Sequence, residues 1–239
     1  IMSKKINTKL SKLIKYYNLI NYNLIFNNKE IIRYKKKELT SESTIEKSLI
    51  NLSREISEIR GCKLKDNASK QVFSDGNSKS KIMIIGEGPG ANEDKEGLPF
   101  VGRAGQLLDK MLDAINLNRS NVYITNVVNY RPPENRKPTD QEVKRYLPFL
   151  KKHILIIRPK IILLLGSTAM NAILENSDVI SKMRGKWHEV IIEKSKIFTI
   201  VSFHPAYLLR QPDQKKFSWE DLKKIRDKIK NLNIKIEKN

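Results

Sequence analysis

The sequence predicts an α/β fold in which four parallel strands form a central sheet that helices cover on both faces. Four short apolar runs lack the polar–apolar alternation expected of a strand with one face in water. These candidate strands are residues 81–86, 121–125, 160–165 and 197–201. Longer segments with apolar residues at helical spacing follow the strands. These candidate helices are residues 103–116, 139–157, 167–175 and 217–230. Buried strands that alternate with amphipathic helices are typical of parallel sheets.

Residues 1–40 are expected to be separate from this fold. Residues 9–26 have apolar residues at roughly helical spacing, and the basic run Arg33–Lys37 lies further along. We interpret residues 1–40 as a basic N-terminal extension that is weakly helical or disordered. Residues 44–60 have clearer helical periodicity, and Ser41 or Ser43 could cap that helix. The expected α/β domain is therefore residues 41–239.

Composition limits the classes of protein and partner. The chain has 239 residues, 39% of them hydrophobic, and a formal net charge of +20. This charge indicates a polyanionic partner, most simply nucleic acid, although a general excess of Lys, Asn and Ile contributes to it. The single cysteine, Cys62, excludes a disulfide within the chain and a metal site of four cysteines. The sequence has no apolar stretch of membrane-spanning length and no secretory signal pattern, so we expect a cytoplasmic protein.

A glycine-rich loop follows the first strand. Residues 86–91 (GEGPGA) match the pattern of a dinucleotide-binding turn, but this match alone is weak. Such a turn needs a helix that begins inside the loop. Gly97 and Pro99 disfavour a long helix there, so we expect the helix to begin near Gly102–Arg103. Acidic residues in the loop also disfavour phosphate. We predict a pocket-forming loop and keep a nucleotide-binding α/β protein as a weaker alternative.

Candidate site residues follow the ends of the strands, where parallel sheets carry their binding sites. They are Glu87, Glu93, Phe100, Asn126 and His204. An amide can read the edge of a pyrimidine, an aromatic ring can stack on a base, and an imidazole can stabilise an oxygen that gains negative charge. A carboxylate can activate water. Each residue alone also has a structural explanation, as a core aromatic, a strand-end cap or a solvated charge. Together they supply what an enzyme needs to flip a base and cleave its glycosidic bond.

Five motifs occur in order along the chain. They are GEGPGANEDKEGLPFVGRAGQLLDKML (86–112), VYITNVVNYRPPENRKPT (122–139), IRPKIILLLGSTA (157–169), MRGKW (183–187) and SFHPAYLLR (202–210). Together they resemble the type 4 uracil-DNA glycosylases, from about Ile56 to Asp227. The resemblance implies a three-layer α/β/α fold and an enzyme of base excision repair. Such an enzyme hydrolyses the N-glycosidic bond of uracil in single- or double-stranded DNA and leaves an abasic site.

The resemblance also implies roles for the residues of the pocket. Phe100 would stack on the flipped uracil, and Asn126 would hydrogen-bond its amide edge. His204 would bind the O2 side of uracil and stabilise the departing anion. Glu93 would place or activate water and help to exclude the methyl group of thymine. Glu87 would join Glu93 and His204 in the catalytic set and, with Gly88, would shape the pocket.

Further residues would contact DNA in this resemblance. The stretch Pro205–Arg210 would wedge into the duplex where the base has left, and the MRGKW motif would lie near the phosphates. The implied DNA-binding residues are Arg184, Lys186, Pro205, Tyr207, Leu208, Leu209 and Arg210.

The chain departs from the family at the ligands of an iron–sulfur cluster. The family holds a 4Fe–4S cluster on four cysteines, and the corresponding positions here are Ile59, Cys62, Tyr130 and Tyr146. Three of these four residues are not thiols, whereas such a cluster needs thiolate or comparable ligands. We therefore expect the cluster to be lost, no other cofactor or metal to replace it, and packing to tie residues 56–65 to residues 128–147. Cys62 is expected to be a buried thiol.

Two functional classes remain open at this point. The first is an active uracil-DNA glycosylase, a monofunctional hydrolase that needs no lysine nucleophile. The alternative is a catalytically impaired DNA-binding protein of the same fold. The intact set of pocket residues favours the enzyme. We expect a monomer that acts on DNA and has no contact with a membrane.

Overall fold

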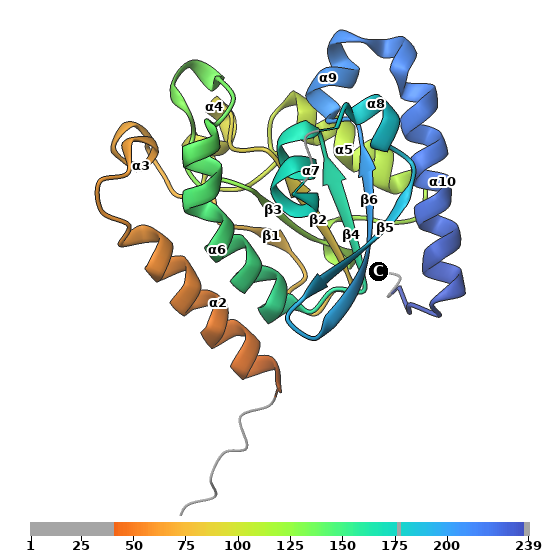
Figure 1. The fold of residues 1–239 in the computed structure, drawn as a ribbon, viewed down its shortest axis with the longest axis horizontal. Coiled ribbons are helices and arrows are strands. Elements are labelled where there is room, and N and C mark those ends of the chain that lie inside the picture. The colour runs from red at the N-terminus through yellow and green to blue at the C-terminus, as the bar shows by residue number, and fades with distance from the viewer. Residues whose placement is uncertain (1–40, 176–177, 237–239) are drawn as a thin grey trace, which may run out of the picture. The chain divides into compact units, whose positions relative to one another are not determined.

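The computed structural model describes residues 41–175 and 178–236, and it confirms the predicted parallel sheet. The predictions made for residues 1–40 lie outside the described residues. The four parallel strands are β2 (Ile82–Gly86), β3 (Tyr123–Asn126), β4 (Ile161–Leu165) and β6 (Ser195–Ser202). They lie side by side in the order β3-β2-β4-β6 (Figure 1).

Two edge strands were not predicted from the sequence. β1 (Asp75–Gly76) pairs antiparallel with β3, and β5 (Trp187–Ile192) pairs antiparallel with β6. The search for continuous buried runs misses β5 because most of its residues are partly or fully exposed. β1 is too short to have a periodicity of its own.

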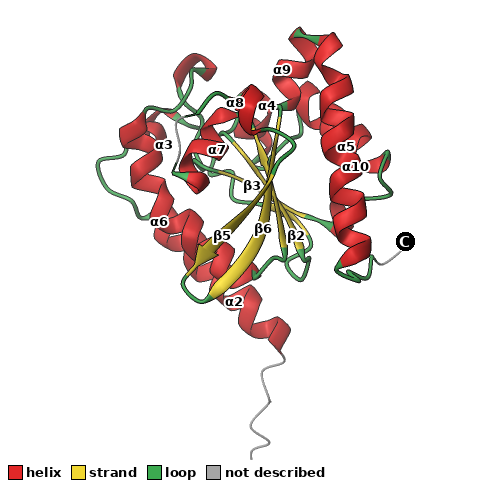
Figure 2. Cartoon of the chain, turned by 45° about the vertical axis from the view of Figure 1, so that its right-hand side comes forward, coloured by secondary structure: helices red, strands yellow, loops and turns green. Residues whose placement is uncertain are grey.

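Helices cover both faces of the sheet (Figure 2). One layer contains α2 (Ser41–Ser57), α6 (Asp140–Ile157) and α7 (Ser167–Leu174), and the other contains α5 (Arg103–Asp113) and α10 (Lys215–Asn231). Alternate residues of a strand face opposite layers, because successive side chains of a strand point to opposite faces. In β2, Met83 and Ile85 pack in the core on the α6 side, whereas Ile82 and Ile84 pack on the α5 side. The predicted three-layer α/β/α fold is therefore confirmed.

The short helices lie in the connections. They are α3 (Lys63–Asn67), α4 (Ala91–Glu96), α8 (Ile180–Met183) and α9 (Pro205–Arg210). Single 3-10 turns occur at Arg119–Asn121, Pro133–Asn135 and Pro212–Gln214. In the described part of the chain, no helix has the length and apolar character needed to cross a membrane.

The helix α4 corrects one expectation about the glycine-rich loop. A helix does begin inside this loop, directly after Gly90, although it has only six residues. The Glu93 side chain accepts a hydrogen bond from the Gly90 N–H and so caps the helix start, and Gly97 ends it in a left-handed conformation with φ +84°. The long helix, α5, begins at Arg103, as predicted.

Candidate active site

The carboxyl ends of the parallel strands bring residues from distant parts of the sequence into one row. In the sheet register, Gly86 at the end of β2 lies beside Asn126 at the end of β3, and Leu165 of β4 lies beside Ser202 of β6. Gly166 follows Leu165 directly, His204 is the second residue after Ser202, and a Cβ placed on Gly166 would lie 3.1 Å from the His204 Cβ. The strand ends therefore form one wall of a site, as expected for a parallel sheet.

A cavity of about 720 Å³ opens at this edge of the sheet. All the residues predicted for the pocket line it, and they come from the loop after β2, the last residue of β3 and the loop after β6. They are Glu87, Gly88, Glu93, Phe100, Asn126 and His204. This size is within the usual range for a small-molecule pocket and is sufficient for a single nucleobase.

Asn126 offers an unpaired acceptor at the base of the cavity. The residue is 3% exposed, and its Oδ1 atom is buried with no hydrogen-bond partner among the described residues. A buried polar atom without a partner is costly, so a ligand that donates a hydrogen bond here would gain affinity. The absence of a side chain on Gly86 makes this arrangement possible, because a Cβ at that position would lie 2.4 Å from Asn126 Oδ1.

Phe100 and His204 form two aromatic surfaces beside that acceptor. Their ring centroids are 5.6 Å apart and the ring planes differ by 28°. The Phe100 Cζ would lie 2.5 Å from a Cβ on Gly86, so Phe100 and Asn126 approach the same backbone position. The amide, the phenyl ring and the imidazole thus lie together, as the sequence predicted for the ends of the strands.

His204 is a neutral hydrogen-bond donor in this setting. Its Nδ1 accepts a hydrogen bond from the Ala206 N–H at 3.2 Å, at the start of α9, so the proton of the neutral ring is on Nε2. The pKa of His204 is lowered to about 4, chiefly by burial and also by the nearby Arg210 charge, while Glu93 acts in the opposite direction. At neutral pH the ring is uncharged and can donate from Nε2.

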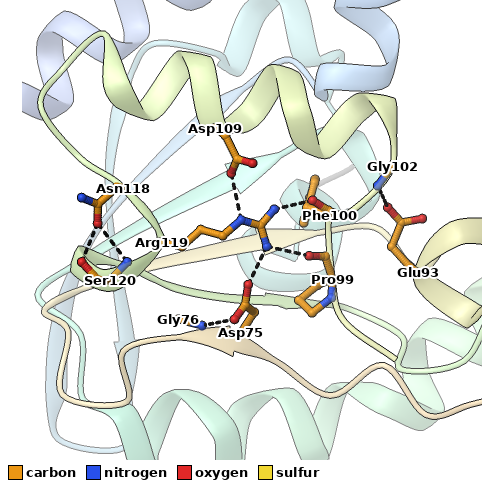
Figure 3. A network of polar contacts seen from close by, with 10 residues as sticks. All are labelled: Asp75, Gly76, Glu93, Pro99, Phe100, Gly102, Asp109, Asn118, Arg119 and Ser120. Atoms are coloured by element: carbon orange, nitrogen blue, oxygen red, sulfur yellow. Dashed lines mark hydrogen bonds and ion pairs between the residues drawn. The ribbon is translucent and has the colours of Figure 1, made fainter. Parts of the chain in front are cut away.

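The two glutamates of the glycine-rich loop are held in different ways. The Glu87 carboxylate accepts a hydrogen bond from the Thr168 hydroxyl on α7. The Glu93 carboxylate accepts from the Gly90 N–H at 3.1 Å. It also accepts from the Gly102 N–H at 2.8 Å (Figure 3). Glu93 therefore ties the two ends of the segment that carries Phe100.

The comparisons with known proteins agree with this geometry. The model of the uracil DNA glycosylase superfamily matches residues 73–224, which include every strand end of the cavity. The chain belongs to the uracil-DNA glycosylase superfamily. It is similar to a type-4 uracil-DNA glycosylase of Sulfurisphaera tokodaii, with 42% identity over 75% of this chain and 84% of that protein. Type-4 enzymes of Archaeoglobus fulgidus (41% identity, 74% and 92% covered) and Thermotoga maritima (40%, 75% and 93%) are also similar.

The residues that the glycosylase family implies for DNA contact have different environments. Tyr207 and Arg210 line the cavity, and Leu209 is 37% exposed beside them. Leu208 is buried in the core on the α5 side, so Leu209 is the leucine of the pair at the surface. Pro205 is also buried, at the first position of α9. Of the stretch that the family implies for the wedge, Leu209 is exposed, whereas Pro205 and Leu208 are buried.

The two cationic side chains of the MRGKW motif, Arg184 and Lys186, have different environments. The Arg184 guanidinium pairs with the fully buried Asp221 and donates to the Phe217 carbonyl oxygen. Lys186 is exposed. Lys186 is therefore accessible at the surface, whereas the Arg184 side chain is engaged with Asp221 and Phe217 inside the protein.

Sequence reasoning missed one segment that lines the cavity. This segment is residues 131–138 (RPPENRKP), and its Arg136 and Lys137 line the cavity. Arg136 forms two hydrogen bonds with Glu142, at 2.7 and 2.8 Å, and this pair holds the pKa of the Glu142 carboxyl at about 2. The clustering of proline and basic residues was the available signal for a rigid, cationic loop.

The four positions of the family cluster form a packed apolar contact. Cys62 and Tyr146 are buried, and the Cys62 Sγ lies 3.2 Å from the Tyr146 Oη in a hydrogen bond. Tyr130 is buried in the same cluster, against which Ile59 packs. Burial raises the pKa of Tyr146, and the hydrogen bond to Cys62 raises it further. Among the described residues, no group of three or more His, Cys, Asp or Glu could hold a metal. One thiol in four positions does not fit a cluster held by four thiolates.

Proposed function

We propose that this chain excises uracil from DNA by hydrolysing its N-glycosidic bond and leaves an abasic site. The family and the type-4 relatives support this reaction. The observation that carries the proposal is the buried Oδ1 atom of Asn126, which has no partner among the described residues and lies beside two aromatic rings. The N3–H group of uracil is a donor that would satisfy it.

The amide of Asn126 explains the choice of base. Uracil presents a donor at N3 and acceptors at O2 and O4, so Asn126 can accept from N3 and donate from Nδ2 to O4. Cytosine presents an acceptor at N3, which would face the Asn126 Oδ1 and leave two lone pairs opposed. Phe100 stacks on the flipped base.

His204 and the glutamates supply the chemistry. As the bond to the sugar breaks, negative charge develops on uracil, and the neutral His204 donates a hydrogen bond from Nε2 to the O2 atom. Both Glu93 oxygens accept a backbone N–H, and each has a second lone pair with which to place the attacking water. Glu93 also narrows the site against the methyl group of thymine. Glu87, held by Thr168, and Gly88 complete the wall.

The strand of DNA is held at the mouth of the cavity. Leu209 enters the space that the base leaves, while Tyr207, Arg210 and Lys186 contact the backbone. Arg136 and Lys137 approach the phosphates from the opposite wall. The buried Pro205 and Leu208 anchor α9 from below, and Arg184 holds the MRGKW motif against α10.

The proposal also covers the cofactor, the oligomeric state and the domain bounds of the chain. The chain works without the iron–sulfur cluster of the family, because Tyr130, Tyr146 and Ile59 fill the space by packing. It acts as a monomer on single- and double-stranded DNA. The glycosylase domain is residues 41–239, and residues 1–40 are an extension that changes affinity for DNA rather than the chemistry.

The test uses oligonucleotides that carry uracil, thymine or cytosine at one position, in single- and double-stranded form. Alkali cuts the strand wherever an abasic site has formed. We expect cleavage at uracil in both forms and rates roughly 10³-fold lower at cytosine, because a site built to hydrogen-bond one base edge leaves polar groups unpaired with another. Thymine has the same hydrogen-bonding edge as uracil, so slower cleavage at thymine is expected from the contact of its methyl group with Glu93. Binding without cleavage would instead identify a catalytically impaired DNA-binding protein, and equal cleavage at cytosine would refute the role of Asn126.

A further inference from the structure

Arg119 lies outside the cavity but contacts the backbone of Phe100. It begins the 3-10 turn before β3, and its guanidinium points toward the segment that precedes α5 (Figure 3). Its Nη1 donates to the Pro99 carbonyl oxygen at 3.1 Å, and its Nη2 donates to the Phe100 carbonyl oxygen. The Arg119 side chain therefore holds the carbonyl groups of two successive residues, Pro99 and Phe100. Phe100 is the residue proposed to stack on the base.

Two carboxylates fix this guanidinium from different elements. Arg119 Nη1 pairs with Asp75 of β1 at 2.5 Å, and Arg119 Nε pairs with Asp109 of α5 at 2.9 Å. Neither carboxylate nor Arg119 is among the residues that line the cavity. The planar fork of an arginine can satisfy these four acceptors at once, whereas a lysine offers its donors from a single atom.

The backbone of Phe100 needs such support. Its φ is +56°, a left-handed conformation that is unusual for a bulky aromatic residue and costs on the order of 1–3 kcal/mol. Its carbonyl oxygen also passes so close to α5 that a Cβ on Gly105 would lie 1.6 Å from it. On the other flank, the Gly102 N–H is held by Glu93. The Phe100 ring thus has a defined position only while its backbone is held on both sides.

We propose that Arg119 is a positioning residue for uracil excision, which holds the Phe100 ring against His204 by binding the Pro99 and Phe100 carbonyl groups. The inference rests on the proposed function, since Phe100 is the surface on which the base stacks. The ion pairs of Arg119 with Asp75 and Asp109 are partly exposed, and such pairs contribute little to the stability of the fold. A role in stability alone therefore does not explain why Arg119 also binds the two carbonyl groups.

The test compares Arg119→Met and Arg119→Lys with the wild type, in otherwise intact protein. The matched control is Lys152→Met, which removes the exposed pair between Lys152 and Glu55. We expect kcat for uracil excision to fall about 10–100-fold in Arg119→Met and less in Arg119→Lys, because a misplaced stacking surface slows the reaction. KM is expected to change less than about twofold, since phosphate contacts dominate binding. The control should retain wild-type kinetics.

A Phe100→Ala background separates positioning from stability. If Arg119 acts through the Phe100 ring, adding Arg119→Met to Phe100→Ala should cause no further loss of kcat. An equal loss in both backgrounds, or wild-type kcat in Arg119→Met, would overturn the proposal.

Hydrogen exchange gives a readout that does not depend on activity. We expect residues 98–105 to exchange faster in Arg119→Met than in wild type or Lys152→Met, and unchanged exchange there would also overturn the proposal. An inactive wild type would refute the proposed function alone, and the exchange measurement would still decide the role of Arg119.

Discussion

Asn126, Phe100 and His204 each lie against a glycine whose missing side chain leaves room for them. Gly86 admits the Asn126 amide and the Phe100 ring, and Gly105 admits the Phe100 carbonyl group. Gly166, with φ +91°, brings the end of β4 against His204. The glycines of the motifs therefore serve close approach between side chains and backbone, rather than the cradle of a phosphate.

The low pKa of His204 gives a prediction for the pH dependence of activity. Because burial lowers this pKa to about 4, the ring stays neutral down to that pH, and protonation below it ends the hydrogen bond that Nδ1 accepts from Ala206. We expect kcat/KM to persist at pH 5.5 and to fall with a midpoint near 4. A fall centred near 6.5, the ordinary histidine value, would show that the surroundings of His204 do not lower its pKa.

The same residue makes stability depend on pH with a definite sign. Between pH 6.5 and 4 the unfolded chain binds a proton at His204 that the folded chain does not, so stability falls as the pH is lowered through this range. The effect is complete below the folded pKa. Melting curves should show a shallower loss over this range in His204→Asn than in wild type.

At the scale of elements, the connections between helices and strands supply most of the residues that line the site. The strands and long helices follow from buried runs and helical spacing, which is why the sequence predicts them. The helix α4 was missed because its short span depends on a contact between Glu93 and Gly90, and the Arg119 network was missed because its partner Asp75 is 44 residues away. Periodicity reports burial, whereas such contacts appear only once the chain has folded.

The packing of α6 against the segment before β1 gives a prediction about the positions that hold the iron–sulfur cluster in the family. Cys62 contacts Tyr146 of α6 in an apolar environment, so Cys62→Ala should remove packing and one hydrogen bond. We expect a loss of about 1–2 kcal/mol in the free energy of unfolding, or roughly 2–8 °C in melting temperature. Uracil excision measured well below that temperature should be unchanged.

The iron content of the wild type and of Cys62→Ala would be measured as a control for the presence of a cluster. Both the wild type and Cys62→Ala should be colourless and contain no stoichiometric iron. Iron in the wild type that is lost on Cys62→Ala, together with activity, would mean that the cluster is present and needed.

At the scale of the whole molecule, one parallel sheet gathers a site from four segments that span more than a hundred residues. Glu87, Asn126 and His204 were predicted to lie together because parallel strands end at one edge, and the structure places all three on one cavity. The lining by Arg136 and Lys137 could not be predicted in this way, since these residues lie well beyond the end of β3 along the chain. The proposed choice of base rests on the buried Asn126 Oδ1 atom, whose lack of a hydrogen-bond partner among the described residues only the structure reveals.

The release of free uracil in a single turnover tests this assembly most directly. The wild type would be compared with Asn126→Ala, His204→Ala and the double variant, and with His188→Ala as a matched histidine control on β5, away from the cavity. The account predicts rapid release by the wild type and the control, and a loss of about 10²–10³-fold for His204→Ala, as for removal of one preorganised donor. Release by the double variant at the wild-type rate would contradict it.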